Sequence, residues 1–291
     1  MKIVVVGPGR AGGSLAVAAR SAGHELVGLF GRRTTDQPVA EHLGVRVRLI
    51  GEPLPEADLL VVAVRDDALP EVAATLSQPA DRVRGAIHLS GLTSVGVLDP
   101  LRETGLVTGS FHPLQTLPGW EAGSRALPGA FVGITAPDGW ATELESFARS
   151  LGCRPFRIAD ERKPLYHAAG GVAANYVSAA LCVAEYMFTE ADVDPAAARP
   201  MVEQAVANAF DLGFRESLTG PISRGDLGTV RRQIEAVDRH APDASEAFRA
   251  LTRLTAQLAG RVEVEEILRL ATRPPGGSRS PGPATEGGRP S

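Results

Sequence analysis

The 291-residue sequence is poor in the residues that build disulfide frameworks and zinc sites. Its two cysteines, Cys153 and Cys182, lie far apart, and neither belongs to a C-x-x-C motif or has a histidine neighbour. This usage excludes a disulfide scaffold and gives no zinc-ligand spacing. The sequence also has no H-x-x-x-H motif and no carboxylate cluster, so we expect no bound metal.

Strong charge and long apolar runs are missing as well. A net charge of −4 gives no reason to expect nucleic acid or anionic lipid as a partner. No uninterrupted apolar stretch approaches the ~20 residues that cross a bilayer, and the apolar run at the N-terminus is too short for a signal peptide. With 44% hydrophobic residues, the chain is expected to be globular, cytoplasmic and long enough for two domains.

The first thirty residues have the order of a dinucleotide-binding unit. The apolar run Lys2–Val6 predicts a buried strand, and Gly7-Pro-Gly-Arg-Ala-Gly12 follows it and satisfies G-x-G-x-x-G. Residues 14–22 then predict a helix and residues 25–30 a second strand. A glycine-rich turn without a ligand is the alternative, but strand, loop, helix and strand occur in the order that the motif requires.

Each glycine has a role in such a unit. Gly7 allows a tight turn, Gly9 lets a pyrophosphate approach the backbone, and Gly12 lets the helix pack on the strand. The phosphates would bind the free N–H groups at the helix start, which Arg10 and Ala11 supply. We therefore expect all five residues in the cofactor site.

The residues after the second strand favour NADP(H) over NAD(H). An NAD site carries Asp or Glu about 20 residues past the glycines, to bind the ribose 2′-hydroxyl. Here Arg32 and Arg33 occupy this place, and the first carboxylate is Asp36. Arginine suits a 2′-phosphate because its planar guanidinium is permanently charged, although both residues would also fit a solvated turn.

Strands and helices continue to alternate as far as residue 159. Further strands are expected at residues 45–49, 59–64, 85–90, 106–108, 131–135 and 155–158. This alternation predicts an α/β fold with a doubly wound parallel Rossmann sheet. Ligands bind beyond the carboxyl ends of such strands. We therefore expect functional residues at the strand ends, which are Gly7, Val64–Asp67, Ser90–Gly91 and His112.

From residue 160 onward the pattern is helical. Helices are expected at residues 164–188, 195–212, 226–240, 245–259 and 262–271. We therefore expect a Rossmann domain at residues 1–159 and an all-helical domain for substrate binding and dimerisation at residues 160–272. Residues 273–291 are rich in Pro, Gly and Ser and are expected to form a disordered tail.

Three polar residues share a sector of the first expected helix. At about 100° per residue, Lys163 and His167 lie about 40° apart, and His167 and Asn175 about 80° apart. Reduction of a carbonyl needs a group that stabilises the alkoxide and supplies a proton, which His or Lys can do. Lys163, His167 and Asn175 are therefore the candidate catalytic residues. A surface lysine and a histidine at a domain seam are the alternatives.

Other candidates lie at strand ends and in a loop. Ser90 could bind the nicotinamide carboxamide or the substrate, or be part of a turn; Val64 would line the cofactor. His112, before Pro113 in a rigid turn, is expected as a wall of the substrate pocket or as the proton donor. The substrate candidates between two helices are Thr219, Arg224, whose guanidinium suits a carboxylate, and Asp226, for which an N-cap role is favoured.

Several motifs occur together in one group of bacterial proteins. Besides the N-terminal glycines, they are His88-Leu-Ser-Gly91, Phe111-His-Pro-Leu-Gln115, Tyr166-His-Ala-Ala169 with Asn175, and Leu218-Thr-Gly-Pro221 with Arg224-Gly-Asp226. In these the chain resembles two-domain proteins that join a Rossmann-like domain to a helical domain of unknown function. Some members are PanG-type ketopantoate reductases. The resemblance implies an NADPH-dependent reductase of a small 2-keto acid, and more distant similarity to 6-phosphogluconate-dehydrogenase-like enzymes implies a homodimer.

The resemblance has one departure that matters for chemistry. Better-known ketopantoate reductases carry a Lys followed four residues later by Asn, whereas here His167 lies at that spacing from Lys163 and the Asn is at 175. The identity of the proton donor therefore stays open. An imine reductase of the pyrroline-5-carboxylate reductase type and a regulatory protein that binds NADP(H) without turnover remain alternatives, and a deazaflavin cofactor also stays open.

Overall fold

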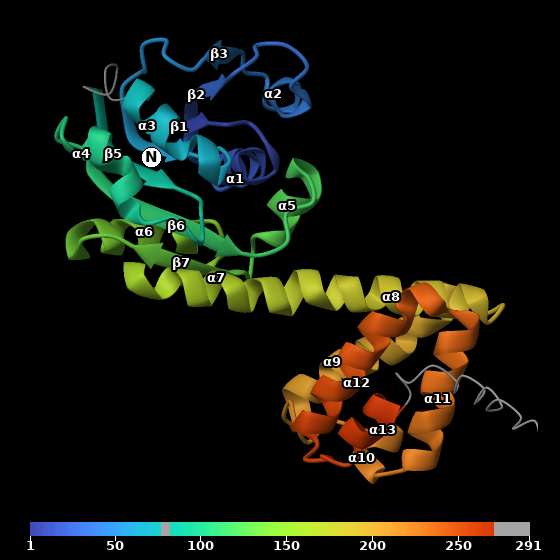
Figure 1. The fold of residues 1–291 in the computed structure, drawn as a ribbon. Helices are drawn as coiled ribbons and strands as arrows, with labels where there is room; N and C mark the ends of the chain where they lie inside the picture. Colours follow the sequence, from blue (N-terminus) through green and yellow to red (C-terminus); the bar gives the residue numbers. More distant parts are fainter. Residues whose placement is uncertain (77–81, 271–291) are drawn as a thin grey trace, which may run out of the picture. The chain divides into compact units, whose positions relative to one another are not determined.

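The computed structural model describes residues 1–76 and 82–270, in two compact units, Met1–Asn175 and Tyr176–Ser291 (Figure 1). The helix that begins at Lys163 therefore belongs to the first unit as far as Asn175. The expected tail at residues 273–291 lies outside the described residues.

The first unit is built on an eight-stranded sheet with the order β3-β2-β1-β4-β5-β6-β7-β8 (Figure 1). The first six strands have the order of a doubly wound dinucleotide-binding sheet, which confirms the predicted fold class. The strands are β1 (Lys2–Val6), β2 (Glu25–Gly31), β3 (Val47–Leu49), β4 (Ala57–Val62), β5 (Val83–His88), β6 (Val107–Leu114), β7 (Phe131–Thr135) and β8 (Arg154–Arg157).

Both faces of the sheet are covered, and the central strands carry buried apolar side chains on both faces. In β1, Ile3 and Val5 belong to one buried cluster, and Val4 and Val6 belong to another. Each such side chain contributes about 1.5–3 kcal/mol when it is fully buried. The first cluster includes α1 (Arg10–Ser21), α2 (Pro38–Leu43) and α6 (Asp138–Ser150); the second includes α3 (Leu69–Leu76), η3 (Val95–Leu98) and α4 (Asp99–Arg102). A further helix, α5 (Trp120–Ala126), packs on α1.

The sheet departs from the expected parallel pattern at β6. This strand continues through His112 and Pro113 to Leu114 and pairs antiparallel with β7, so that His112 faces Gly133 in register. His112 therefore lies inside a strand and not in a rigid turn. Pro113 is tolerated because the pairing of β6 with β5 ends at Ser110, and a proline is compatible with a strand segment that has a neighbour on one side.

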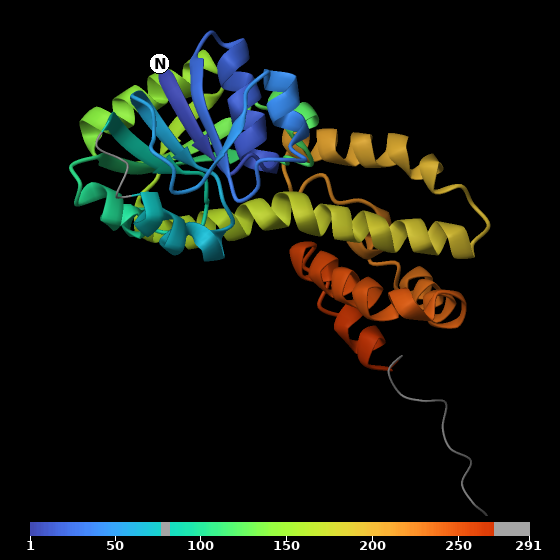
Figure 2. The ribbon, with the colours of Figure 1, turned by 90° about the horizontal axis from the view of Figure 1, so that it is seen from above.

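A continuous helical run follows the sheet (Figure 2). It consists of η4 (Asp160–Arg162), α7 (Lys163–Gly171), a π-helical turn η5 (Val172–Tyr176) and α8 (Val177–Glu190). By length and composition alone, the stretch Asp160–Glu190 could cross a membrane, which the sequence analysis did not expect. Its first turn, however, is bonded to the sheet domain through the buried side chain of Lys163.

The described part of the second unit is helical, as predicted. Its elements after α8 are η6 (Pro195–Ala198), α9 (Arg199–Leu212), α10 (Gly220–Arg224), α11 (Leu227–His240), η7 (Pro242–Ala244), α12 (Ser245–Leu258) and α13 (Val264–Leu270). Val230 and Ile234 of α11 pack with Ala256 of α12 and Val264 of α13 in a small core. The short helix α10 replaces part of the loop that was expected before Asp226.

Candidate functional site

A cleft of about 570 Å³ opens where the strand order reverses, between β1 and β4. Ligands bind at this place in doubly wound sheets. Of the predicted cofactor residues, Gly7, Gly9, Arg32, Arg33 and Val64 line it, whereas Arg10, Ala11, Gly12 and Ser90 are not among its lining residues. The remaining lining residues are Pro8, Gly31, Gln37, Ile50, Ala63, Arg65, Asp67, Ala68, Glu71 and Val72.

The glycines of the motif are required by close backbone contacts. Gly7 has φ +98°, and a Cβ on it would lie 2.5 Å from the carbonyl oxygen of Ala63. A Cβ on Gly12 would lie 2.1 Å from the carbonyl oxygen of Gly7, whereas a Cβ on Gly9 would meet open space. Gly7 and Gly12 therefore allow close packing, and Gly9 leaves room for a ligand.

The start of α1 can receive an anion. Gly9 is its N-cap, and within the described residues no side chain bonds to this end of the helix. The first N–H groups of the helix, from Arg10 and Ala11, are thus available to a phosphate, and the helix dipole favours its negative charge.

Arg65 is a cleft residue that the sequence placed only within the strand end Val64–Asp67, without a role in cofactor binding. It follows β4, and its guanidinium is bonded to Asp67 with N–O distances of 3.0 and 2.5 Å. Arg32 and Arg33 line the same cleft, so three guanidinium groups gather where the sequence analysis placed two. The position of Arg65 at the end of a predicted strand was the signal that could have indicated it.

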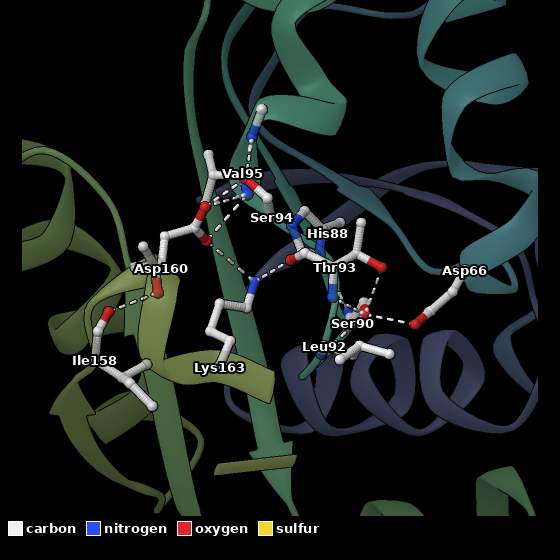
Figure 3. Close-up of polar contacts among 12 residues, drawn as sticks. Asp66, His88, Ser90, Leu92, Thr93, Ser94, Val95, Ile158, Asp160 and Lys163 are labelled. Carbon is white, nitrogen blue, oxygen red and sulfur yellow. Dashed lines mark hydrogen bonds and ion pairs between the residues drawn. The ribbon is translucent and has the colours of Figure 1, made fainter. Parts of the chain in front are cut away.

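Ser90 is held in a polar network after β5 (Figure 3). Its hydroxyl oxygen lies 2.7 Å from a carboxylate oxygen of Asp66 and accepts hydrogen bonds from the backbone N–H groups of Leu92 and Thr93 at 3.2 and 2.9 Å. The turn-forming role of Ser90, one of the two roles considered, is therefore present. Asp66 belongs to the predicted strand end Val64–Asp67, and Thr93 joins the network as a residue that the sequence did not single out.

Lys163 is buried, with a side chain only 1% exposed, and it is not the surface residue considered as an alternative. Its ammonium donates a hydrogen bond to the carbonyl oxygen of Thr93 and lies 3.7 Å from a carboxylate oxygen of Asp160 (Figure 3). Asp160 also accepts from the N–H of Val95 at 3.1 Å. Burial lowers the pKa of Lys163, and the charge of Asp160 opposes this shift. Lys163 thus ties the loop after β5 to the start of α7.

His112 contacts two residues of α7. Its Nδ1 lies 2.8 Å from the hydroxyl of Tyr166, and its ring centroid lies 5.8 Å from that of His167. Burial, reinforced by His167 and Lys163, lowers the pKa of His112 to about 4, so the ring is neutral near pH 7. The structure thus brings His112 and His167 together.

Tyr166 opens the motif Tyr166-His-Ala-Ala169 but is not among the predicted site residues. Its ring stands edge-on to Phe156, with centroids 5.7 Å apart, and its hydroxyl lies over Gly133, where a Cβ would be 3.2 Å from the oxygen. Burial raises the pKa of Tyr166 to about 12. The sequence carried no signal for this contact, because it depends on the unexpected extension of β6.

Asn175 lies in the π-helical turn. The angle of about 80° to His167 assumed a regular α-helix. A π-turn has i→i+5 hydrogen bonds and rotates less per residue, so it moves Asn175 toward the line of His167. Such turns are frequent at functional sites.

Thr219, Arg224 and Asp226 belong to the second unit, around α10. Asp226 accepts a hydrogen bond from the N–H of Thr229 at 3.0 Å and is the N-cap of α11, which confirms its capping role. Thr219 is the N-cap residue of α10, and Arg224 is exposed in the last turn of that helix. A substrate role for these three residues stays a prediction. Within residues 1–76 and 82–270, no group of three His, Cys, Asp or Glu side chains could hold a metal ion.

Comparison with protein families finds two models that match successive parts of the chain. Residues 1–113 match the Rossmann-like domain, and residues 130–255 match the domain of unknown function DUF2520. Among curated protein sequences, none matches the chain significantly.

Solved structures share the fold at low sequence identity. A Bacteroides fragilis protein assigned as an NADP oxidoreductase is 19% identical, with a TM-score of 0.76 over 88% of this chain and 98% of its own. A Streptomyces aurantiacus imine reductase is 17% identical, with a TM-score of 0.64 over 94% and 100% of the two chains. A Plasmodium falciparum pyrroline carboxylate reductase with NADP bound is 13% identical, with a TM-score of 0.59 over 94% and 98%.

The buried histidines predict how stability depends on pH. Burial is the main cause that lowers the pKa of His88 to about 3, and it also lowers that of His112 to about 4. Between pH 6.5 and 4, these two histidines therefore bind protons in the unfolded chain but stay neutral in the folded protein. The free energy of unfolding, measured with urea, should therefore fall as the pH drops from 6.5 to 4, by at most about 1.4 kcal/mol per pH unit for each histidine.

The variant His88→Gln should show a shallower pH dependence than the wild type over this range. His240→Gln, at an exposed position in α11, is the matched control and should keep the wild-type slope. Equal slopes in wild type and His88→Gln would contradict the burial of a neutral His88.

Proposed function

We propose that this chain, which joins a Rossmann-like domain to a DUF2520 domain, is an NADPH-dependent reductase of a small 2-keto acid, with ketopantoate as the first candidate. The observation that carries the proposal lies in the first unit. The cleft around Gly7–Gly9 and Arg32–Arg33 lies at the carboxyl ends of β1, β2 and β4. In the same unit, His112 of β6 contacts Tyr166 and His167 of α7.

The residues of the cleft fit NADPH. Gly9 leaves open space beside the uncapped start of α1, which suits a pyrophosphate. Arg32 and Arg33 follow β2 where an NAD site would have a carboxylate, and they suit a 2′-phosphate. The structural similarity to a reductase with NADP bound also supports this choice. NADPH supplies a hydride when it is bound.

A cluster that can donate a proton favours a carbonyl substrate. When a carbonyl carbon accepts hydride, its oxygen becomes an alkoxide that needs a proton, and a positioned acid accelerates this step. The first unit offers Tyr166, His112 and His167 for it, whereas Lys163 is engaged with Thr93 and Asp160. Asn175 would orient the carbonyl, and Thr219 and Arg224 of the second unit stay the candidates for the carboxylate.

An imine reductase is the second candidate, favoured by the structural similarity to an imine reductase and a pyrroline carboxylate reductase. It needs a weaker acid, because the amine product takes its own proton from water. A regulatory protein that binds NADP(H) without turnover is the third.

NADPH oxidation, followed by absorbance, separates the candidates. With ketopantoate we expect substrate-dependent oxidation well above the rate without substrate, and with 1-pyrroline-5-carboxylate we expect little. A preference for the cyclic imine would instead identify the protein as an imine reductase. Tight NADPH binding without turnover of either substrate would favour the regulatory protein.

The two arginines after β2 should determine the choice of cofactor. Replacing both Arg32 and Arg33 by Ala removes charge-assisted hydrogen bonds worth about 1.5–3 kcal/mol each, so the Kd for NADPH should rise by about 100-fold or more. The Kd for NADH, measured by the same fluorescence titration, should change little. Arg20→Ala, in the last turn of α1, is the control. A parallel loss of NADH binding would contradict a 2′-phosphate site.

We further propose a homodimer, in agreement with the resemblance of the chain to dimeric enzymes. The helices α8 and α9 contain no buried residue, and large apolar side chains are exposed on and after α9, with Met201 63%, Phe210 75% and Phe214 70% exposed. A second copy would cover these apolar side chains, because a group of exposed apolar residues is typical of an interaction surface.

Light scattering on the protein as it elutes from a size-exclusion column should therefore give twice the chain mass of 30.5 kDa. Phe210→Glu should shift the protein toward the monomer, because a buried charge at an apolar interface is costly. Val262→Glu, at a residue 84% exposed between α12 and α13, should leave the mass unchanged. A monomeric wild type at all concentrations would exclude the dimer.

A further inference from the structure

We propose that the hydroxyl of Tyr166, paired with His112, donates the proton to the reduced carbonyl; this inference rests on the proposed reductase function. Tyr166 would be the catalytic acid, and His112 would position its oxygen and stabilise the phenolate. Two glycines, Gly91 and Gly133, provide the space that this pair requires.

The other two candidates are less suited to the step. Lys163 is 1% exposed, and its ammonium already contacts the carbonyl oxygen of Thr93 and a carboxylate oxygen of Asp160. To reach a substrate, the ammonium of Lys163 would have to leave these partners, and separating a buried charge from its partners costs several kcal/mol. His167 is exposed, and a mobile acid on the surface is less well positioned than one fixed by packing.

The pair has a defined place on the sheet. A Cβ on Gly91 would lie 2.6 Å from Cε1 of His112, so the imidazole lies directly over the backbone just after Ser90. A Cβ on Gly133 would lie 3.2 Å from the hydroxyl oxygen of Tyr166, and Phe156 stands edge-on to the tyrosine ring. The imidazole therefore lies beside the carboxyl end of β5, where the fold places the reacting half of a dinucleotide, and the phenol hydroxyl lies 2.8 Å from its Nδ1.

The protonation of both groups suits an acid. Burial raises the pKa of Tyr166 to about 12, so its hydroxyl keeps the proton at neutral pH. His112 is neutral, because burial and the neighbouring His167 and Lys163 outweigh Asp66 and lower its pKa to about 4. In the tautomer with a proton on Nδ1, His112 donates to the tyrosine oxygen, and the phenolic proton is then free for the substrate.

The proposed step balances. The carbonyl carbon accepts a hydride from NADPH, the π electrons of the C=O bond move to oxygen, and this oxygen takes the proton of Tyr166. The phenolate accepts the hydrogen bond from Nδ1 of His112 until it regains a proton from water. The net change is oxidation of NADPH to NADP⁺ and reduction of the ketone to an alcohol, with one proton consumed. A phenol is a stronger acid than the alcohol formed, so the transfer is downhill.

The first test removes the hydroxyl alone. Tyr166→Phe should lower kcat for the keto acid about 100-fold or more, the usual contribution of a positioned acid, with the Kd for NADPH unchanged. Tyr186→Phe, at a half-buried tyrosine of α8, is the matched control and should keep the wild-type kcat. Unchanged NADPH affinity would also verify that the Tyr166→Phe protein is folded.

The pH profile distinguishes a tyrosine from a histidine acid. With Tyr166 as the acid, kcat of the wild type should be constant from pH 6 to 9, because both members of the pair keep their protonation states there. A histidine acid would lose its proton within this range, and kcat would fall. His112→Asn, which retains an N–H donor, should lower kcat less than Tyr166→Phe while KM changes little.

The outcomes separate this inference from the proposed function. A wild type that reduces the keto acid while Tyr166→Phe retains kcat within threefold would overturn the role of Tyr166 alone. A kcat that falls through neutral pH would assign the acid to His167 instead. A wild type that binds NADPH but reduces neither keto acid nor imine would overturn the function, and the proton donor with it.

Discussion

The buried contact of Lys163 determines where α7 begins relative to the sheet. Its ammonium joins the carbonyl oxygen of Thr93 to the carboxylate of Asp160, and Asp160 in turn receives the N–H of Val95 (Figure 3). Because the Lys163 ammonium is buried, leaving it without these partners would be destabilising, so the contact holds the loop after β5 to the first turn of α7. Tyr166 follows Lys163 by three residues on the same helix, and its contact with His112 depends on this attachment.

A second constraint acts at the other end of the site. Gly7 and Gly12 let α1 approach β1 and β4 so closely that a Cβ at either position would overlap backbone atoms. Gly9, the N-cap of α1, lines the same cleft as Arg32 and Arg33, and no side chain of the described residues caps this end of the helix. The phosphate end is therefore built from backbone and permanent charge, and the reacting end is built from neutral side chains. Local electrostatics thus suits each end of the proposed cofactor.

Sequence reasoning was successful where local pattern determines structure. Apolar periodicity and glycine spacing predicted β1, α1 and β2, and the strand-end rule predicted that Gly7 and Val64 would meet in one cleft. The prediction was wrong for β6, because the strand was expected to end at residue 108, with Pro113 in a rigid turn. The pairing of β6 with β5 ends at Ser110, and this makes Pro113 acceptable inside the strand. Tyr166 was missed for a related reason: its partner His112 is distant in sequence, and no periodicity records a tertiary contact.

Burial produces the chemical character of the reacting end. The low polarity that makes His112 neutral also keeps Tyr166 protonated, and both shifts leave hydrogen-bond donors without net charge beside the sheet. A neutral donor is well matched to hydride transfer, because negative charge appears on the carbonyl oxygen only as the reaction proceeds. A donor that is strongest toward this developing charge stabilises the transition state more than the ground state, which is the condition for catalysis. The extension of β6 that places His112 opposite Gly133 is therefore the feature that links the fold to the proposed reaction.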